Sequence, residues 1–121
     1  MIATDDRVQE ALKEGHRIDI TTTGRKSGEP RRIELVFHNI DGRTYISGRP
    51  ESPRAWIANL RADPVMIFHL KETVVADLPA RGRVILERTE RERIIPTIAA
   101  GWGYEPALMI ASSPLIEVTF D

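Results

Sequence analysis

The chain has 121 residues and a mass of 13.7 kDa, the size of one ordinary domain that can bury a core without disulfides. Lys and Arg number 17 against 18 Asp and Glu, and a formal net charge of −1 argues against a protein that wraps nucleic acid. There is no cysteine, which excludes thiol nucleophiles and thiolate metal sites, and no apolar run approaches the roughly 18 residues of a membrane-spanning helix. We expect one domain over residues 1–121. The polar, acidic start of the sequence predicts a cytoplasmic location without a signal peptide.

The first half of the sequence predicts one helix and then three strands. The helix covers residues 4–14, and Thr4 or Asp5 is its expected N-cap. The strand segments alternate in polarity or are rich in β-branched residues, and they are 16–24, 31–40 and 43–48. Asp41-Gly42 predicts a tight hairpin turn between the second and third of them.

The second half predicts the remaining strands, at 64–70, 74–78, 80–87 and 115–120. Pro79 separates the middle two, which are expected to be distinct strands. The strands follow one another through hairpins, so we expect a largely antiparallel sheet. The predicted fold is α+β and mainly β: six or seven mostly antiparallel strands closed into a small barrel, with three or four short helices.

Three more helices are predicted between these strands. Ser52-Pro53 begins one that ends at Asp63-Pro64, because Ser is a favoured N-cap and Pro suits the first helical position. Thr89 and Glu92 have the capping-box spacing for a second helix that reaches about residue 100. Pro96 predicts a kink or break inside it. A short third helix begins at 105–106.

The sequence TTTGRKSGEPRR, residues 21–32, is the strongest candidate for a binding site. Its four cations, Arg25, Lys26, Arg31 and Arg32, outnumber the single anion Glu29 and give a local charge of +3. A loop bracketed by glycines can also present successive backbone N–H groups as a nest for an anion. The pattern therefore predicts a phosphate-binding loop, and a solvated hairpin loop is the alternative reading.

This segment, the strand and Asp-Gly turn after it, and SPRAWIANLRADP at 52–64 resemble the deazaflavin-dependent nitroreductase and quinone reductase family. Motif order and spacing agree over roughly residues 17–95. The resemblance implies a split β-barrel related to the flavin reductases. It also implies a reduced deazaflavin coenzyme (factor 420), bound by its phosphate and oligoglutamate tail, and an enzyme that transfers hydride to quinones, nitroaromatics or similar acceptors.

The resemblance also implies which residues bind the cofactor. For the phosphate and tail they are Arg25, Lys26, Ser27, Gly28, Arg31 and Arg32. For the ring system they are the backbone of Ser47, Gly48, Arg49 and Pro50, with Pro53, Trp56 and Asn59 positioning that loop and the helix beneath it. Tyr104, in the turn GWGYEP, is the candidate catalytic residue, as a hydrogen-bond donor to the acceptor.

Several alternatives remain open at this point. FMN is the alternative cofactor, and a non-catalytic flavin- or ligand-binding protein of the same fold is the alternative function, because the loop at 48–51 is shorter than the family's and Pro50 lacks a backbone donor. His16, His38 and His69 are expected to be satisfied or surface histidines, and no metal site is expected. A homodimer is the expected assembly. The basic loop has no interleaved aromatic residues for nucleic acid.

Overall fold

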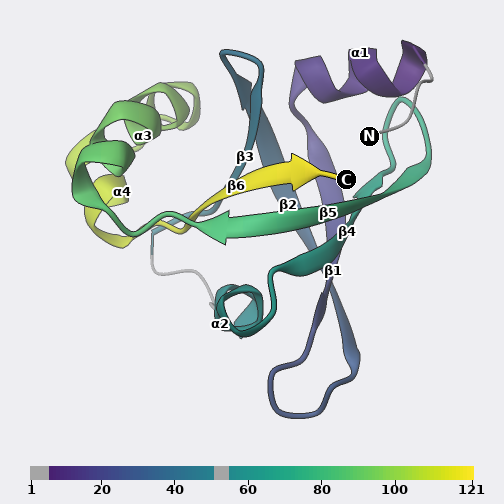
Figure 1. The fold of residues 1–121 in the computed structure, drawn as a ribbon. Helices are drawn as coiled ribbons and strands as arrows, with labels where there is room; N and C mark the ends of the chain where they lie inside the picture. The colour runs from purple at the N-terminus through teal and green to yellow at the C-terminus, as the bar shows by residue number, and fades with distance from the viewer. Residues whose placement is uncertain (1–5, 51–54) are drawn as a thin grey trace.

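Six strands and four helices make up the part of the chain that the structure, a computed structural model, describes: residues 6–50 and 55–121 (Figure 1). In chain order they are α1 (Asp6–Glu14), β1 (Arg17–Thr23), β2 (Pro30–Ile40), β3 (Arg43–Ser47), α2 (Ala55–Ala62), β4 (Val65–Leu70), β5 (Ala76–Val84), α3 (Arg88–Trp102), α4 (Pro106–Ser112) and β6 (Leu115–Phe120). The helix starts predicted at Thr4 or Asp5 and at Ser52-Pro53 lie outside the described residues.

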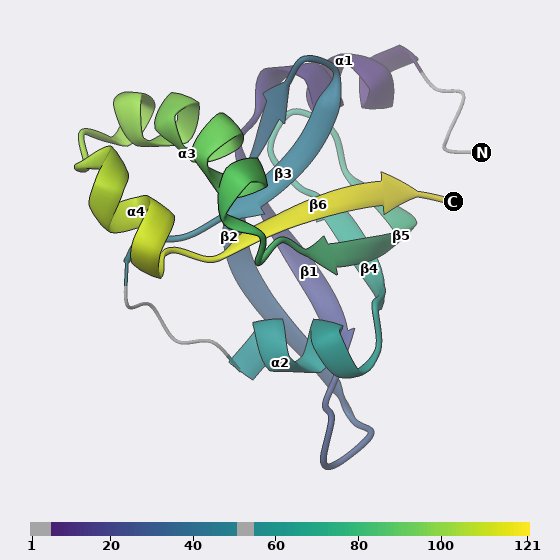
Figure 2. The same cartoon turned by 60° about the vertical axis from the view of Figure 1, so that its left-hand side comes forward.

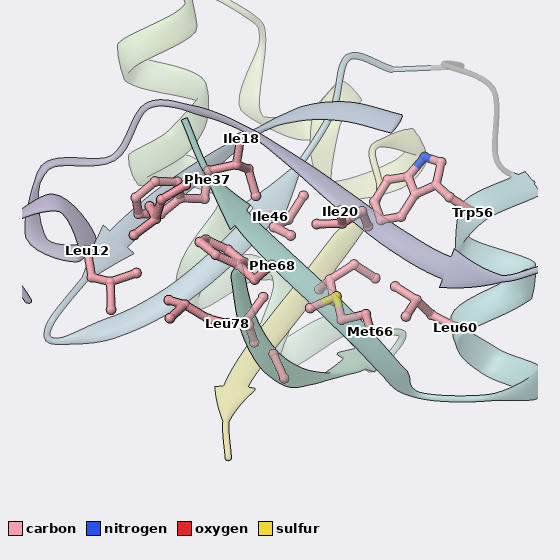
Figure 3. Close-up of a cluster of buried hydrophobic side chains, with 14 of the residues drawn as sticks. Leu12, Ile18, Ile20, Phe37, Ile46, Trp56, Leu60, Met66, Phe68 and Leu78 are labelled. Atoms are coloured by element: carbon pink, nitrogen blue, oxygen red, sulfur yellow. The ribbon is translucent and has the colours of Figure 1, made fainter. Parts of the chain in front are cut away.

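The strands close into an antiparallel barrel in the order β1-β2-β3-β6-β5-β4, and β4 pairs with β1. The predicted split barrel is confirmed, with six strands. Alternate residues of each strand point inward, and Ile18, Ile20, Phe37, Ile46 and Phe68 are each at most 1% exposed (Figure 3). The rings of Phe37 and Phe68 meet edge to face with centroids 5.3 Å apart, a favourable geometry for an aromatic pair.

The helices are distributed around the barrel (Figure 2). The amphipathic helix α1 covers one end of it, and its buried residues join the barrel core. At the opposite end, α2 packs against β1 and β5 beside the projecting β1–β2 hairpin. Helices α3 and α4 pack on each other and, with β3 and β6, enclose a second core cluster. None of the helices within 6–50 and 55–121 is long and apolar enough to cross a membrane.

The two strands predicted on either side of Pro79 are a single strand, β5. Gly82 N–H donates to the carbonyl of Pro64, on the β4 side, so odd-numbered residues of β5 direct their backbone groups toward β6. The nitrogen of Pro79 therefore faces the point just beyond the last β6 residue, Phe120, where no ladder bond is needed. Its carbonyl oxygen accepts a bond from Asp121 N–H instead.

Helix α3 also departs from the prediction. Its N-cap is Glu87, whose carboxylate accepts bonds from the N–H groups of Thr89 and Glu90, so Thr89 lies inside the helix. The predicted break at Pro96 does not occur, since the helix continues to Trp102 and ends at Gly103 in the left-handed conformation (φ 74°). Apolar residues on both sides of Pro96, including Ile95 and Ile98, are buried in the second cluster, and this packing offsets the lost hydrogen bond.

The second cluster contains one buried charge, the guanidinium of Arg91, which is 9% exposed. It donates to four backbone carbonyls, those of Ile85, Met109, Ile110 and Ser113. These bonds join α3 to the C-terminal end of α4 and to Ile85, in the short connection between β5 and α3. The α3–α4 unit, which carries Trp102 at the end of α3 and Tyr104 in the turn after it, is fixed in this way.

Candidate functional site

Strand β2 pairs with β1 along its first part, Pro30 to Val36, and with β3 along its second part, Val36 to Ile40. Against β1 the register runs continuously from Arg17↔Val36 to Thr23↔Pro30. Against β3 it runs from Ile40↔Arg43 to Val36↔Ser47 and stops there. The chain diverges from β2 after Ser47, so the half of β2 before Val36 has one unpaired edge among the described strands. This fork is the split in the barrel.

Two adjoining hollows lie along the unpaired edge. The basic hollow, of about 400 Å³, is lined by Gly24, Arg25, Lys26, Ser27, Arg31, Arg32, Ile33, Ala55, Trp56 and Asn59. The aromatic hollow, of about 530 Å³, is lined by Ile33, Glu34, Leu35, Val36, Ser47, Gly48, Arg49, Trp56, Trp102 and Tyr104. Ile33 and Trp56 belong to both, so the two hollows form one groove with a cationic end and an apolar end.

Most of the residues predicted from the sequence therefore lie in one place. The predicted residues that line the groove are Arg25, Lys26, Ser27, Arg31, Arg32, Ser47, Gly48, Arg49, Trp56, Asn59 and Tyr104. Gly28 and Pro50 do not line either hollow. Gly28 instead has a positive φ of 73° in the hairpin turn, a conformation in which glycine is unstrained.

The anion nest predicted for the 24–28 loop is mostly absent, because the loop satisfies its own amides. Gly24 N–H donates to the Glu29 carbonyl and Gly28 N–H to the Gly24 carbonyl, both at 2.8 Å. Glu29 N–H donates to Ser27 Oγ at 3.1 Å. Within the described part of the loop, the amides of Lys26 and Ser27 are the two without an acceptor. The groups that this loop leaves available to a ligand are therefore mainly side chains.

Asn59, predicted as a cofactor contact, holds the basic loop in place. Its side chain is buried at 4% exposure, and its Oδ1 accepts from Arg25 N–H at 3.1 Å and from the Arg25 guanidinium at 3.3 Å. Its Nδ2 donates to Thr22 Oγ1 at 3.3 Å. One amide from α2 therefore fixes both the end of β1 and the first cation of the loop.

Ser27 and Ser47 differ in what their hydroxyls can still do. Ser27 Oγ accepts from Glu29 N–H and from the Arg31 guanidinium at 3.4 Å, which leaves its hydrogen free to donate to an anion. Ser47 is 1% exposed and donates to the Pro114 carbonyl at 2.7 Å. Ser47 thus fixes the fork, and its hydroxyl hydrogen is already used.

The apolar end of the groove is closed by Trp102, which the sequence places with Tyr104 in the GWGYEP turn as a possible pocket-lining aromatic. Its ring meets that of Tyr104 edge to face at 6.5 Å. Tyr104 is 36% exposed and lines the aromatic hollow. Ile33 to Val36 of β2 line the same end. The sequence indicates these residues only indirectly. The predicted strand at 31–40 is longer than its hairpin partner at 43–48, so its first residues extend beyond that partner.

The three histidines pack against or hydrogen-bond to other residues of the fold, and none of them lines the groove. His69 bridges Thr21 and Asp77, with both hydrogen bonds at 2.7 Å, and His16 packs edge to face on Phe37 at 5.0 Å. His38 lies behind Trp102 with ring centroids 5.1 Å apart, and its buried Nε2 has no hydrogen-bond partner among the described residues. Burial lowers the pKa of His38 to about 4, so this imidazole is neutral at physiological pH.

Comparisons with known proteins bear on the family and the fold of this chain. A family model described as F420H(2)-dependent quinone reductase matches residues 3–102. A solved protein from Listeria innocua, assigned as a pyridoxamine 5'-phosphate oxidase, is 15% identical with a TM-score of 0.70, over 96% of this chain and 92% of that chain. An F420-H2 dependent reductase, FDR-A, is 20% identical with a TM-score of 0.60, over 85% of this chain and 93% of that one. A structure described as a domain-swapped dimer is 25% identical with a TM-score of 0.58, over 89% and 82% of the two chains.

Acid should destabilise the protein partly through His38. Its pKa is about 4 when folded against about 6.5 when unfolded, so between these pH values the unfolded chain binds a proton that the folded chain does not. The free energy of unfolding must therefore fall as the pH drops from 6.5 toward 4. In His38→Phe, which keeps a ring against Trp102 and cannot be protonated, that fall should be shallower. Urea unfolding of both proteins at pH 7, 6, 5 and 4 measures it, and parallel pH profiles would contradict the assignment.

Proposed function

The chain belongs to the F420H(2)-dependent quinone reductase family, and from that premise we propose that its groove binds the reduced deazaflavin lengthwise and directs hydride to a quinone, nitroaromatic or similar acceptor. As a member of this family it is an oxidoreductase with a deazaflavin cofactor. The observation that carries the proposal is the groove along the β2 edge, which is cationic at one end and aromatic at the other.

The residues present fit such a cofactor. Its anionic phosphate and oligoglutamate tail needs cations and donors, which the basic hollow offers as the side chains of Arg25, Lys26 and Arg31 and the free hydroxyl hydrogen of Ser27. Its planar ring needs flat apolar walls, which Trp56 and Trp102 supply in the aromatic hollow. An oppositely directed ligand would place its anionic part among the aromatic side chains of Trp102 and Tyr104 and its ring among the cations of the basic hollow.

The protein's own contribution is binding and orientation. A bound reduced deazaflavin supplies the hydride, so the chain needs no nucleophile and no titrating base of its own. Asn59 fixes Arg25, and through it the distance from the tail site to the ring site. Trp102, held by the α3–α4 unit, limits the space above the ring. The acceptor enters beside Tyr104, a partly exposed residue whose hydroxyl can donate to a carbonyl or nitro oxygen.

FMN is the rival cofactor, since it carries a related ring and a single phosphate. The three cations Arg25, Lys26 and Arg31 of the basic hollow favour the longer anionic tail, because one phosphate would engage only part of this set. Titration of the purified protein with each cofactor, followed by absorbance, separates the two. A protein that binds the deazaflavin and reduces no quinone or nitroaromatic compound would instead support a carrier.

Removing two loop cations should weaken cofactor binding without unfolding the protein. Arg25→Ala/Lys26→Ala loses charge-assisted hydrogen bonds, and we expect affinity for the oxidised deazaflavin cofactor to fall by about 1–3 kcal/mol. The control Arg88→Ala/Arg93→Ala removes two exposed cations from α3, so the net charge changes equally. Calorimetric titration measures both variants. Equal affinity in the loop variant and the wild type would refute the tail site.

Tyr104 should affect turnover and not cofactor binding. Tyr104→Phe keeps the ring that contacts Trp102 and removes the hydroxyl, so cofactor affinity should be unchanged. We expect the quinone reduction rate at saturating reduced cofactor to fall about tenfold or more, the scale of a lost proton or hydrogen-bond donor. Steady-state kinetics with menadione measure this. An unchanged rate would show that the acceptor does not use this hydroxyl.

The outer face of β4 and β5 supports a homodimer. Val65 is 45% exposed, and the neighbouring pair Ile67↔Pro79 adds apolar surface. Asp77 and Arg81 flank Pro79 at equal spacing on the outer face of β5, so a two-fold axis near Pro79 would pair Asp77 of each copy with Arg81 of the other. The related structure described as a domain-swapped dimer shows that a protein of this fold associates.

The dimer proposal predicts that Arg81→Asp weakens association, because it places like charges opposite each other across the axis. Arg88→Asp, on α3, changes the charge equally and should not affect association. Sedimentation equilibrium over a range of protein concentrations distinguishes the variants. A wild-type chain that stays monomeric throughout, or an Arg81→Asp variant that associates as well as wild type, would exclude this interface.

A further inference from the structure

The backbone along the free edge of β2 offers hydrogen-bonding groups to the groove. Gly24 N–H donates to the Glu29 carbonyl, and Phe37 N–H donates to the His16 carbonyl at 3.0 Å. In an antiparallel ladder the bonds to one neighbour come from every second residue. Odd-numbered residues of this strand therefore bond to β1. The N–H and C=O groups of the even residues, Arg32 and Glu34, point to the unpaired side.

Pairing with β3 agrees with this parity. Val36, the next even residue, is the last partner of β3, opposite Ser47. Arg17, opposite Val36, directs its N–H away from β2 to Glu72 Oε1 at 2.9 Å. Among the described residues no hydrogen-bond partner exists for the backbone N–H groups of Arg32 and Glu34.

The aromatic hollow meets β2 at this edge. Four consecutive residues of the strand, Ile33 to Val36, line it. A cavity that faced one side of a strand would be lined by alternate residues, because successive side chains point to opposite faces. Contact with consecutive residues means that the hollow approaches the strand from its edge, where the backbone of Glu34 is directed.

The carboxylate of Glu34 is engaged elsewhere. It forms an ion pair with the ammonium of Lys71, which also bonds to Asp19 on the outer face of the barrel at 2.7 Å. Its two carboxylate neighbours raise the pKa of Lys71, so the cation that holds Glu34 persists at all physiological pH values. What Glu34 presents to the groove is therefore its main-chain donor and acceptor.

We infer that the backbone of Glu34 binds the imide edge of the cofactor's pyrimidinedione ring, an inference that rests on the proposed function. The ring N–H donates to the Glu34 carbonyl, and a ring carbonyl beside it accepts from the Glu34 N–H, as a paired strand would do. Arg32 presents the same groups, but it lies in the basic hollow among the tail ligands. This contact sets the position of the ring along the groove and selects rings that carry a cyclic imide.

The test begins with the ligand and uses the wild-type protein. Oxidised deazaflavin cofactor and its derivative methylated on the imide nitrogen are titrated by fluorescence. Because methylation removes the donor and blocks the edge, we expect about tenfold or more weaker binding of the methylated form. Equal affinity for both forms would overturn the inference and leave the proposed function intact. Failure of both forms to bind would overturn the proposed function as well.

The second arm changes the protein. Glu34→Pro removes the backbone N–H on the free edge and costs no bond to β1, and proline is tolerated on strand edges. Glu34→Ala is the matched control, because it loses the same ion pair with Lys71 and keeps the N–H. We expect Glu34→Ala to discriminate between the two ligands as the wild type does, and Glu34→Pro to bind the unmodified cofactor about tenfold or more weakly, with reduced discrimination.

Thermal melting establishes that both variants are folded, and binding of inorganic pyrophosphate to the basic hollow should be the same in both. Full discrimination retained by a folded Glu34→Pro protein would place the imide elsewhere. If Glu34→Pro does not fold, the wild-type comparison of the two ligands still decides the inference.

Discussion

The organisation of the site depends on the unequal lengths of two neighbouring strands. β2 has 11 residues and β3 has 5, so their ladder ends at Val36↔Ser47 while β2 continues along β1 for six more residues to Pro30. A β2–β3 ladder that continued to Pro30 would have satisfied the backbone groups along this edge. Because it stops, the wall opens into a groove, and the strand that borders it stays rigid through its bonds to β1. The groove thus lies along a strand edge whose opposite edge is hydrogen-bonded to β1.

Helix α2 connects the two ends of this groove. Trp56 is 5% exposed and lines both hollows, while Asn59, one turn further along, holds Arg25 and Thr22. Residues i and i+3 share one face of a helix, so a single helix face positions the apolar wall and the first cation together. A shift of α2 would move both. This coupling keeps the spacing between the anionic and planar parts of a ligand fixed, which binding of one elongated molecule requires.

Local sequence signals predicted most of the elements, and the errors have physical causes. The Asp-Gly turn, the alternating strands and the basic loop are short-range features, and they appear where the sequence placed them. Local sequence predicts breaks at Pro79 and Pro96 because residue propensities take account only of the N–H that proline lacks. At Pro79 the N–H is not needed because of where the partner strand ends, and at Pro96 its loss is offset by core packing. Both depend on tertiary structure, which local propensity does not describe. The nest at 24–28 failed likewise, since the loop's own carbonyls accept two of its amides.

The site residues also divide into those that local sequence predicts and those that depend on tertiary structure. Charged and glycine-rich motifs are visible in sequence, so the cationic end could be predicted. The free backbone groups of Glu34 could not, because they follow from the register of three strands and carry no side-chain signature. His38 shows the converse: a titratable residue that invites a catalytic role is buried behind Trp102, where loss of hydration keeps it neutral. With His69 bound between Thr21 and Asp77, and His16 against Phe37, the three histidines contribute to structure. The reactivity of this protein therefore depends on the group that it binds, and the fold's contribution is the shape, charge and backbone edge that orient that group.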